Sequence, residues 1–250
     1  FINAQNIKVK NVDLVLPKKS GELDSIKIMF FSDSHLSTIN EKTVLKEILA
    51  KMYEIKPDLI LIAGDIIDDR SNILYRNNVH KQFQQLKAPL GVFACTGNHE
   101  HIVGVEDAVN FLNSNGVKVL RDTFVTVANS IQIIGREDIS INRFTEKKRK
   151  DLHELVYKTR DDLPTILLDH QPFDLDKTVR EGIDLQLSGH THHGQFFPLN
   201  FITSKIYELS WGYKRKSNSQ FYVTSGVGTW GPPIRTGSDS ELIILNIKFE

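Results

Sequence analysis

Five short groups of polar residues carry side chains suited to chemistry, and each group follows an apolar run of the sequence. They are residues 32–35, 64–68, 97–100, 169–170 and 189–192. An apolar run followed by such residues is typical of a buried strand that gives way to a loop, so we expect all five groups at strand ends. Oxygen and imidazole ligands at one edge of a sheet are what two adjacent divalent cations require. The pattern therefore predicts a dinuclear metal centre.

The spacing within the groups supports this prediction. Asp33 and His35 are two residues apart, so in extended backbone they would point to the same side and share a cation. Asp65 follows a glycine, and its carboxylate has two oxygens that can bridge two cations. The other candidate ligands are an amide oxygen and three imidazoles, from Asn98, His170, His190 and His192. An isolated Asp more often caps a turn, and an isolated His more often makes a structural hydrogen bond. The joint occurrence of all five groups favours a metal site.

The elements that would position these groups alternate between strands and helices. We expect strands at residues 26–31, 59–63, 89–95, 131–134, 165–168, 185–187, 221–223 and 242–247. Helical patterns cover residues 44–52, 105–112, 147–157 and 173–180. Early alternation followed by strands in closer succession indicates an α/β layered fold with at least two sheets. No linker or internal repeat interrupts the pattern, so we expect one domain over residues 1–250.

Composition limits the function classes. The chain has 250 residues, of which 40% are hydrophobic and 25% charged, as in an ordinary globular protein. Lys and Arg together number 31, as do Asp and Glu, so no net positive field favours nucleic acid. We expect Cys95, the one cysteine, to be a buried structural thiol. No run is long enough to span a bilayer. The sequence begins at Phe1, so we expect any signal peptide or anchor to lie upstream of it.

The order of the motifs resembles the calcineurin-like metallophosphoesterase superfamily. The motifs are D-x-H, G-D-x-x-D, G-N-H-E, a His before Gln-Pro, and G-H-T-H, and the resemblance covers residues 32–195 with a further segment at 226–241. It implies a four-layer αββα sandwich of two mixed sheets flanked by helices. The pattern G-H-T-H-x-G-Q is similar to a branch of bacterial membrane-associated or exported phosphoesterases, which implies a membrane-associated or extracytoplasmic location. Members of that branch act on phosphodiesters and on lipid-linked pyrophosphates.

The resemblance also implies a role for each candidate residue. The first metal would be held by Asp33, His35, Asp65 and His192, and the second by Asp65, Asn98, His170 and His190. His99 would face the substrate and either stabilise the transferring phosphoryl group or protonate the departing alkoxide; its alternative is to orient its neighbours. Mixed His, Asp and Asn ligation suits manganese, iron or zinc.

The expected reaction is hydrolysis of a phosphodiester or pyrophosphate bond. Two cations lower the pKa of a shared water from 15.7 to about 7, and the resulting hydroxide attacks phosphorus in line. We expect a phosphoester or pyrophosphate substrate of the lipid-linked or nucleotide type, and no nucleic-acid partner. A phosphomonoesterase or protein phosphatase is the alternative within enzymes, and a non-catalytic metal-binding scaffold is the alternative outside them. The oligomeric state and the metal's identity stay open.

Three further features bear on the substrate. Arg235 is expected either to bind a substrate phosphate or to form a surface ion pair. His193 stands where the resembled branch more often has glycine, and we expect it to contact the substrate, add a ligand or turn outward. The aromatic segment 195–211 would form an exposed substrate rim or an ordinary subdomain core, and the rim with the basic residues up to 216 would contact a membrane surface.

Overall fold

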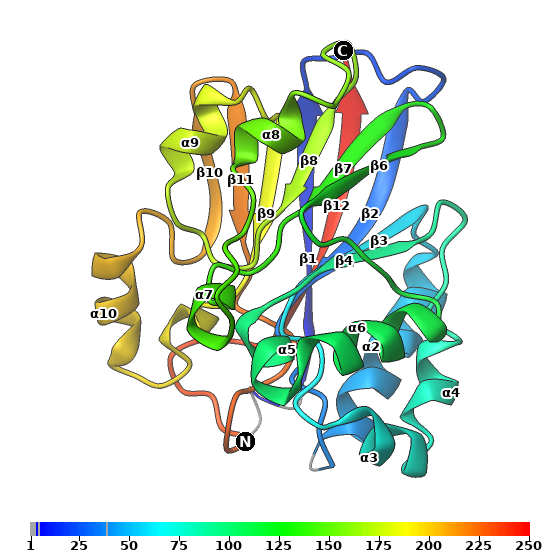
Figure 1. The fold of residues 1–250 in the computed structure, drawn as a ribbon, viewed down its shortest axis with the longest axis vertical. Helices are drawn as coiled ribbons and strands as arrows, with labels where there is room; N and C mark the ends of the chain where they lie inside the picture. The colour runs from blue at the N-terminus through cyan, green and yellow to red at the C-terminus, as the bar shows by residue number, and fades with distance from the viewer. Residues whose placement is uncertain (1–3, 5, 39) are drawn as a thin grey trace.

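Two six-stranded β-sheets pack face to face in the computed structural model, which describes residue 4 and residues 6–38 and 40–250 (Figure 1). The first sheet has the strand order β1 (Lys8–Leu16), β12 (Glu241–Phe249), β2 (Ser25–Phe31), β3 (Leu59–Ala63), β4 (Val92–Cys95) and β5 (Lys118–Val119). The second has the order β10 (Gly212–Lys216), β11 (Ser219–Val223), β9 (Leu185–Ser188), β8 (Thr165–Leu168), β7 (Ile131–Gly135) and β6 (Thr123–Val127). Both sheets are mixed. In the first, β12 runs antiparallel to β2, and in the second the edge strands β10 and β6 run antiparallel to their neighbours.

The apolar runs form these strands because both faces of each sheet are covered. In β2, Ile28 and Phe30 point into the core between the sheets, whereas Met29 and Phe31 pack under the outer helices. This alternation explains why the run is apolar at every position rather than at every second one. Cys95 is fully buried in the core between the sheets, as predicted.

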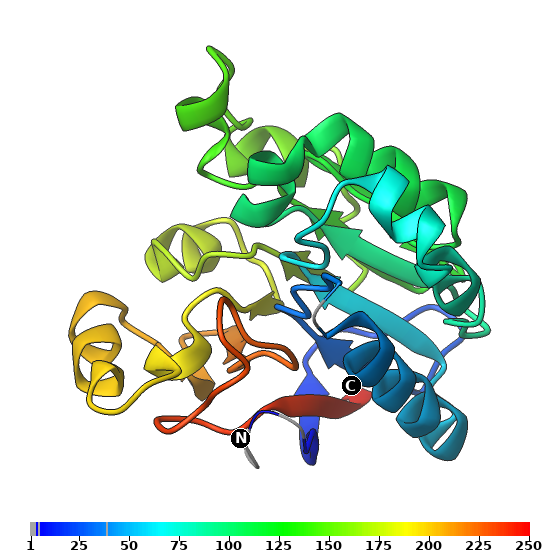
Figure 2. The same ribbon diagram turned by 90° about the horizontal axis from the view of Figure 1, so that it is seen from below.

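Helices form the two outer layers (Figures 1 and 2). The first sheet is covered by α2 (Glu41–Ile55), α3 (Ser71–Arg76), α4 (Val79–Phe83) and α6 (Val105–Ser114). The second is covered by α8 (Leu152–Val156), which buries Leu152 and Leu155 against it. The remaining helices are α5 (Asn98–Val103), α7 (Ile141–Phe144), α9 (Leu175–Arg180), the 3-10 helix η1 (His192–Gly194) and α10 (Leu199–Ile206). The predicted four-layer sandwich is therefore confirmed. Among the described helices, none has both the length and the apolar character needed to cross a bilayer.

The predicted helix at residues 147–157 is wrong over its first five residues. Only residues 152–156 are helical, and the basic run before them is irregular. The helix begins there because Asp151 caps it, accepting a hydrogen bond from the backbone N–H of His153 at 2.9 Å. Upstream of the cap, the backbone N–H of Lys150 donates to the Asp122 carboxylate at 2.6 Å, which ties that segment to the start of β6.

Candidate metal centre

The five polar groups meet at one end of the sandwich, the lower end in Figure 1 and the end seen face-on in Figure 2. Three of the groups follow β2, β3 and β4, which are parallel neighbours in the first sheet. The other two follow β8 and β9, parallel neighbours in the second sheet. Since parallel strands end at the same edge, both sheets deliver their loops to one place.

The backbone is left-handed at five of the seven predicted ligands. The φ angle is positive at 54° for Asp33, 44° for His35, 49° for Asp65, 70° for His190 and 46° for His192. The predicted extended geometry for Asp33 and His35 is therefore wrong, although their side chains still converge. This conformation is unfavourable for residues other than glycine and persists where surrounding bonds enforce it. Here the N–H of Asp33 donates to the carbonyl of Gly64 at 3.0 Å, and that of His35 to the carbonyl of Asp65 at 3.1 Å.

One group of ligand atoms comes from Asp33, His35 and His192. Their ligand atoms all lie within 4.8 Å of one another. His192 Nε2 lies 3.3 Å from Asp33 Oδ1 and 3.1 Å from His35 Nε2. All three side chains are buried. Two imidazole nitrogens and a carboxylate oxygen directed at a common point are an arrangement typical of a divalent cation site.

A second group comes from Asp65, His170 and His190, whose ligand atoms are likewise within 4.8 Å of one another. His170 Nε2 lies 3.1 Å from Asp65 Oδ2, while His170 Nδ1 donates to the carbonyl of Ala63 at 2.7 Å and thereby fixes the ring. Asp65 also approaches the first group, since its Oδ2 atom lies 3.9 Å from His35 Nε2. The two groups are therefore contiguous, with Asp65 between them.

A buried amide oxygen at the site tests whether the residues fit a metal. Asn98 Oδ1 is buried and accepts no hydrogen bond from any described residue. A buried amide oxygen without a partner costs free energy unless something else occupies its lone pairs. Because Asn98 opens α5 directly beside the second group, a cation there would satisfy it. The residues present thus fit divalent cations.

Electrostatics favour the metal-binding protonation state for four of the candidate ligands, Asp33, Asp65, His190 and His192. His170 differs: burial would lower its pKa, but the charge of Asp65 and the hydrogen bond to Asp65 raise that pKa well above its usual value. Burial alone would raise the pKa of Asp33 and of Asp65, but His192 beside the first and His170 beside the second lower both pKa values well below the usual range. Burial lowers the pKa of His192 to about 4. Burial, together with the charge of His170, also lowers the pKa of His190 to about 4. At neutral pH the carboxylates are ionised and these two imidazoles are neutral, so their lone pairs are available.

His99 lies beside both groups. Its backbone N–H donates to Asp65 Oδ1 at 2.8 Å, and its ring Nδ1 lies 2.8 Å from Asp68 Oδ1. The ring contacts His35 edge to face, with 4.4 Å between centroids. Burial would lower the pKa of His99, but the Asp68 hydrogen bond and the charge of Asp65 raise it to about 9. His99 is therefore a cationic group at the edge of the site.

The Glu100 carboxylate joins two loops of the site through hydrogen bonds. It is fully buried, and its carboxylate accepts backbone N–H donors from Asp65 at 3.0 Å, Ile66 at 2.7 Å, Ile67 at 3.2 Å and Gly97 at 2.8 Å. The loop after β3 is thereby joined to the loop after β4. A side chain at Gly97 would overlap Asp65, which explains why glycine is needed at that close approach.

Arg235 is placed differently from the prediction that it binds a substrate phosphate. It is 2% exposed, and its guanidinium donates to the carbonyls of Ser225 at 2.7 Å and Asp239 at 3.2 Å. It also contacts the carbonyl of Gly228 and lies 3.1 Å from His192 Nδ1. Neither a substrate contact nor the alternative surface ion pair agrees with this position. Arg235 thus connects the loop that precedes β12 to His192.

His193 lies to the side of the two ligand groups. Its ring stacks on Trp211 with 5.1 Å between centroids, and its Nδ1 atom lies 3.3 Å from Ser210 Oγ. It belongs to neither group. The contact with substrate predicted for His193 stays a prediction.

Two features near the site differ from what the sequence indicated. Asp169 belongs to one of the five polar groups, but its carboxylate is engaged in two ion pairs, to Arg136 at 3.2 Å and to Arg149 at 2.9 Å. Residues in and beside α7 also approach the site, and nothing in this short stretch of sequence indicates that they would. Their contribution depends on the path of the loop after β7.

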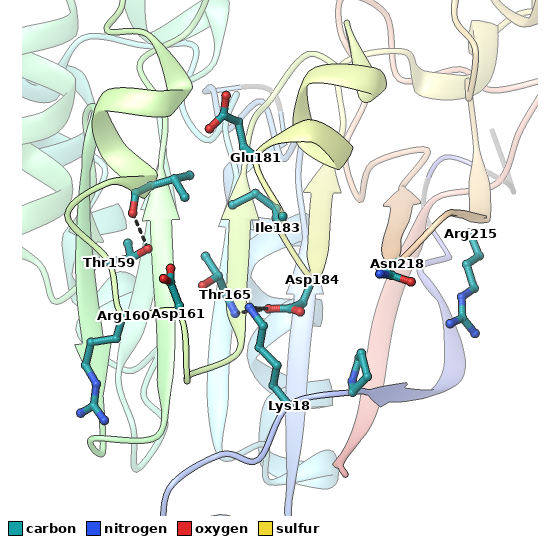
Figure 3. A pocket seen from close by; sticks show the side chains of 13 residues that line it. Lys18, Thr159, Arg160, Asp161, Thr165, Glu181, Ile183, Asp184, Arg215 and Asn218 are labelled. Atoms are coloured by element: carbon teal, nitrogen blue, oxygen red, sulfur yellow. Dashed lines mark hydrogen bonds and ion pairs between the residues drawn. The ribbon is translucent and has the colours of Figure 1, made fainter.

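Two hollows differ in their relation to the ligands. A cavity of about 440 Å³ is lined by Asn98 and His190 and so opens directly onto the site. A larger one, of about 530 Å³, lies where β8 and β9 begin, at Thr165 and Asp184, and is therefore at the opposite end of these strands (Figure 3). Lys18 at its edge is paired with Asp184 at 3.0 Å. We therefore take the smaller cavity as the cleft of the candidate site.

Comparisons with known proteins agree with this geometry. Residues 26–194 match the family model of the calcineurin-like phosphoesterases. A protein of Helicobacter pylori J99 described as an uncharacterized metallophosphoesterase is 32% identical over 246 residues, which are 96% of this chain and 64% of that protein. An Aquifex aeolicus protein of the same description is 34% identical over 226 residues, covering 89% of this chain and 85% of its own length. The chain therefore spans less than two thirds of the length of the Helicobacter relative.

A solved structure resembles the fold at low sequence identity. The 5'-nucleotidase precursor of Thermus thermophilus superposes with a TM-score of 0.54 over 90% of this chain and 54% of that one, at 15% identity. This likeness concerns the arrangement of the two sheets and their helices.

Proposed function

The chain belongs to the calcineurin-like phosphoesterase family of metal-dependent phosphoester hydrolases, and on that premise we propose that it holds two divalent cations and hydrolyses phosphodiester or pyrophosphate bonds. The observation that carries the proposal is the pairing of two ligand groups around Asp65. The first cation would be held by Asp33, His35, Asp65 and His192, and the second by Asp65, Asn98, His170 and His190. Manganese, iron and zinc all suit this donor set.

The chemistry is divided between the cations and the chain. When bound, the cations supply charge for the phosphoryl oxygens and lower the pKa of a water that acts as the nucleophile. His99 is positioned by its Asp68 hydrogen bond at 2.8 Å and is cationic at neutral pH. It can therefore donate a proton to the departing oxygen or stabilise charge on the phosphoryl group.

Metal analysis combined with activity measurement tests the proposal. The protein is stripped with a chelator, reconstituted separately with manganese, iron and zinc, and analysed for bound metal. Turnover is measured on bis(4-nitrophenyl) phosphate, 4-nitrophenyl phosphate and an organic pyrophosphate. Two ions per chain, with diester or pyrophosphate turnover above monoester turnover, are expected. One ion per chain would contradict the dinuclear centre, and monoesterase activity alone would favour the phosphomonoesterase alternative.

The segment 195–216 supports a finer proposal, contact with a lipid surface. The subdomain core that was its alternative is wrong for α10, because the helix has no buried residue. Its Phe201 is 59% exposed, Ile202 53% and Ile206 60%, and Phe197 just before it is 64% exposed. Exposed apolar helix faces of this kind are typical of proteins that lie on a membrane surface. Figure 1 shows α10 standing apart from both sheets.

A zebrafish relative, 29% identical over 98% of this chain, is described as a transmembrane protein with a metallophosphoesterase domain. We propose lipid-linked substrates on this basis.

A further inference from the structure

The cavity beside the candidate metal centre has walls that suit a particular kind of substrate. We name it the α7 pocket and define it by Ile102, Ile139, Arg143, Phe144, Phe173 and Tyr207, which line it together with Asn98 and His190. Its volume of about 440 Å³ is within the range of sites for small organic molecules, roughly 300–1,000 Å³. Because two proposed metal ligands form part of its lining, a group bound there would lie next to the reacting phosphorus, joined to it directly or through a second phosphate.

Apolar side chains line much of the α7 pocket and remain accessible. Ile102 is 59% exposed, Phe144 48%, Phe173 38% and Ile139 37%. Phe173 and Tyr207 face each other with ring centroids 4.9 Å apart. Four large apolar side chains gathered around one hollow indicate a binding surface, since isolated exposed ones would be scattered. Aromatic walls of this kind suit a planar ring or an apolar chain.

The pocket has one charged side chain suited to an anion. Arg143 is the only cationic Lys or Arg among the lining residues, and no acidic residue lines the pocket. Within the described part of the chain, its guanidinium enters no ion pair, unlike that of Arg149, which lies 2.9 Å from Asp169. An unpaired guanidinium beside a phosphoester site can bind a second phosphate through two parallel hydrogen bonds.

A buried polar network fixes the start of α7, the helix that carries Arg143. Asp138, 1% exposed, accepts a hydrogen bond from the N–H of Ser140 at 2.8 Å and another from Gln171 Nε2 at 2.9 Å. The N–H of Asp138 in turn donates to Thr96 Oγ1 at 3.1 Å. These bonds join the start of α7 to the loops after β4 and β8, which carry proposed metal ligands. The position of α7 relative to the site is therefore built into the fold.

We propose that the α7 pocket binds the organic part of a pyrophosphate ester, with Arg143 pairing the phosphoryl group that is not attacked. This inference rests on the proposed function and names its substrate class. Water adds to one phosphorus, the bridging P–O bond breaks and a proton is released. A pyrophosphate esterified at both ends gives two phosphomonoesters, and one esterified at a single end gives a phosphomonoester and inorganic phosphate. The organic part, a nucleoside or a lipid, lies against Phe144, Phe173 and Tyr207.

Arg143→Ala is the variant that tests this inference, with Arg76→Ala as its control. Arg76 is an exposed arginine on α3 that does not line the pocket. The ratio of kcat/KM for an organic pyrophosphate to kcat/KM for bis(4-nitrophenyl) phosphate is measured with manganese-reconstituted protein. We expect this ratio to fall about tenfold or more in Arg143→Ala, mainly through KM, because the diester has no second phosphate for the guanidinium to bind. The control should keep the wild-type ratio.

Two pyrophosphate substrates distinguish a nucleoside from a lipid as the organic part that binds in the pocket. One is a nucleoside diphosphate sugar in solution, and the other is a short-chain diacylglycerol pyrophosphate in detergent micelles. A tenfold fall with either one supports the inference and identifies the source. A ratio that stays within twofold of wild type for both overturns it.

A binding measurement separates failure of this inference from failure of the proposed function. Calorimetry uses the same two pyrophosphates with a methylene group in place of the bridging oxygen, so that no turnover is needed. The wild-type protein could hydrolyse no phosphoester and still bind an analogue about tenfold more tightly than Arg143→Ala does. That result would support the proposed role of the α7 pocket and would reject the proposed hydrolase function. If the wild-type protein and Arg143→Ala bind both analogues with equal affinity, the proposed role of the α7 pocket is overturned.

Discussion

The Oδ1 atom of Asp68 lies 2.8 Å from Nδ1 of His99. The same oxygen lies 3.0 Å from Nδ1 of His35, a proposed metal ligand. One carboxylate thus orients the ring that would hold a cation and the ring that would meet the substrate. Since Nδ1 of each ring is directed to Asp68, the Nε2 atoms are left for the cation and for the substrate.

His99→Ala is expected to lower kcat by about 100- to 10,000-fold while both cations remain bound. The reason is that His99 provides a proton or positive charge to the reaction, whereas the proposed ligands stay in place. Steady-state kinetics and elemental analysis on the same preparation measure the two effects. An unchanged kcat would remove His99 from the catalytic residues, and loss of metal would make it a structural part of the centre.

Asp65→Asn is expected to weaken binding at both metal positions together, because Asp65 lies between the two ligand groups. An amide has one oxygen acceptor and no charge, so it cannot replace a bridging carboxylate. Metal content after dialysis against a weak chelator is the measurement, with Asp162→Asn, an exposed carboxylate paired with Arg160, as the control. Full occupancy of two ions in Asp65→Asn is incompatible with bridging.

Glu137 is expected to make stability depend on acid pH. Burial would raise the pKa of Glu137, but hydrogen bonds from His101 and Thr96 and the charge of Arg121 lower it to about 2. Because the folded pKa lies below the ordinary glutamate value of 4.5, the stabilisation from the Glu137 carboxylate is present above pH 4.5 and is lost as the pH falls towards 2. Urea unfolding between pH 2 and pH 6 should therefore show a smaller dependence on pH in Glu137→Gln than in the wild type. Parallel curves for the two proteins would contradict this.

The double variant Phe201→Ser with Ile206→Ser should reduce binding to lipid vesicles. Both side chains are more than half exposed on α10, at 59% and 60%, so their removal should leave the free energy of unfolding nearly unchanged. Co-sedimentation with vesicles of phosphatidylcholine and phosphatidylglycerol measures the binding, and thermal unfolding provides the control for folding. If the wild-type protein does not sediment with vesicles, or if the variant unfolds at a much lower temperature, α10 is not a membrane-contacting element.

The eight predicted strands are the eight interior strands of the two sheets, and the four strands that were missed are the four sheet edges, β1, β5, β6 and β10. Interior strands are covered on both faces and therefore appear as continuous apolar runs. Edge strands are partly exposed and carry polar and charged residues, as in β10, whose side chains alternate between exposed and half-buried. Such strands have no distinctive composition, and only their pairing partners define them.

Sequence alone determined the candidate ligand types and their positions after the interior strands, because metal chemistry restricts which side chains can bind and strand ends restrict where they occur. The tertiary structure decided which ligands share a group: His190 and His192 are two residues apart, yet one joins Asp65 and the other joins Asp33. It also turned Arg235 inward, left α10 exposed and brought Arg143 to the cleft. Each of these outcomes depends on contacts between segments that are distant in the chain, and local sequence does not encode such contacts.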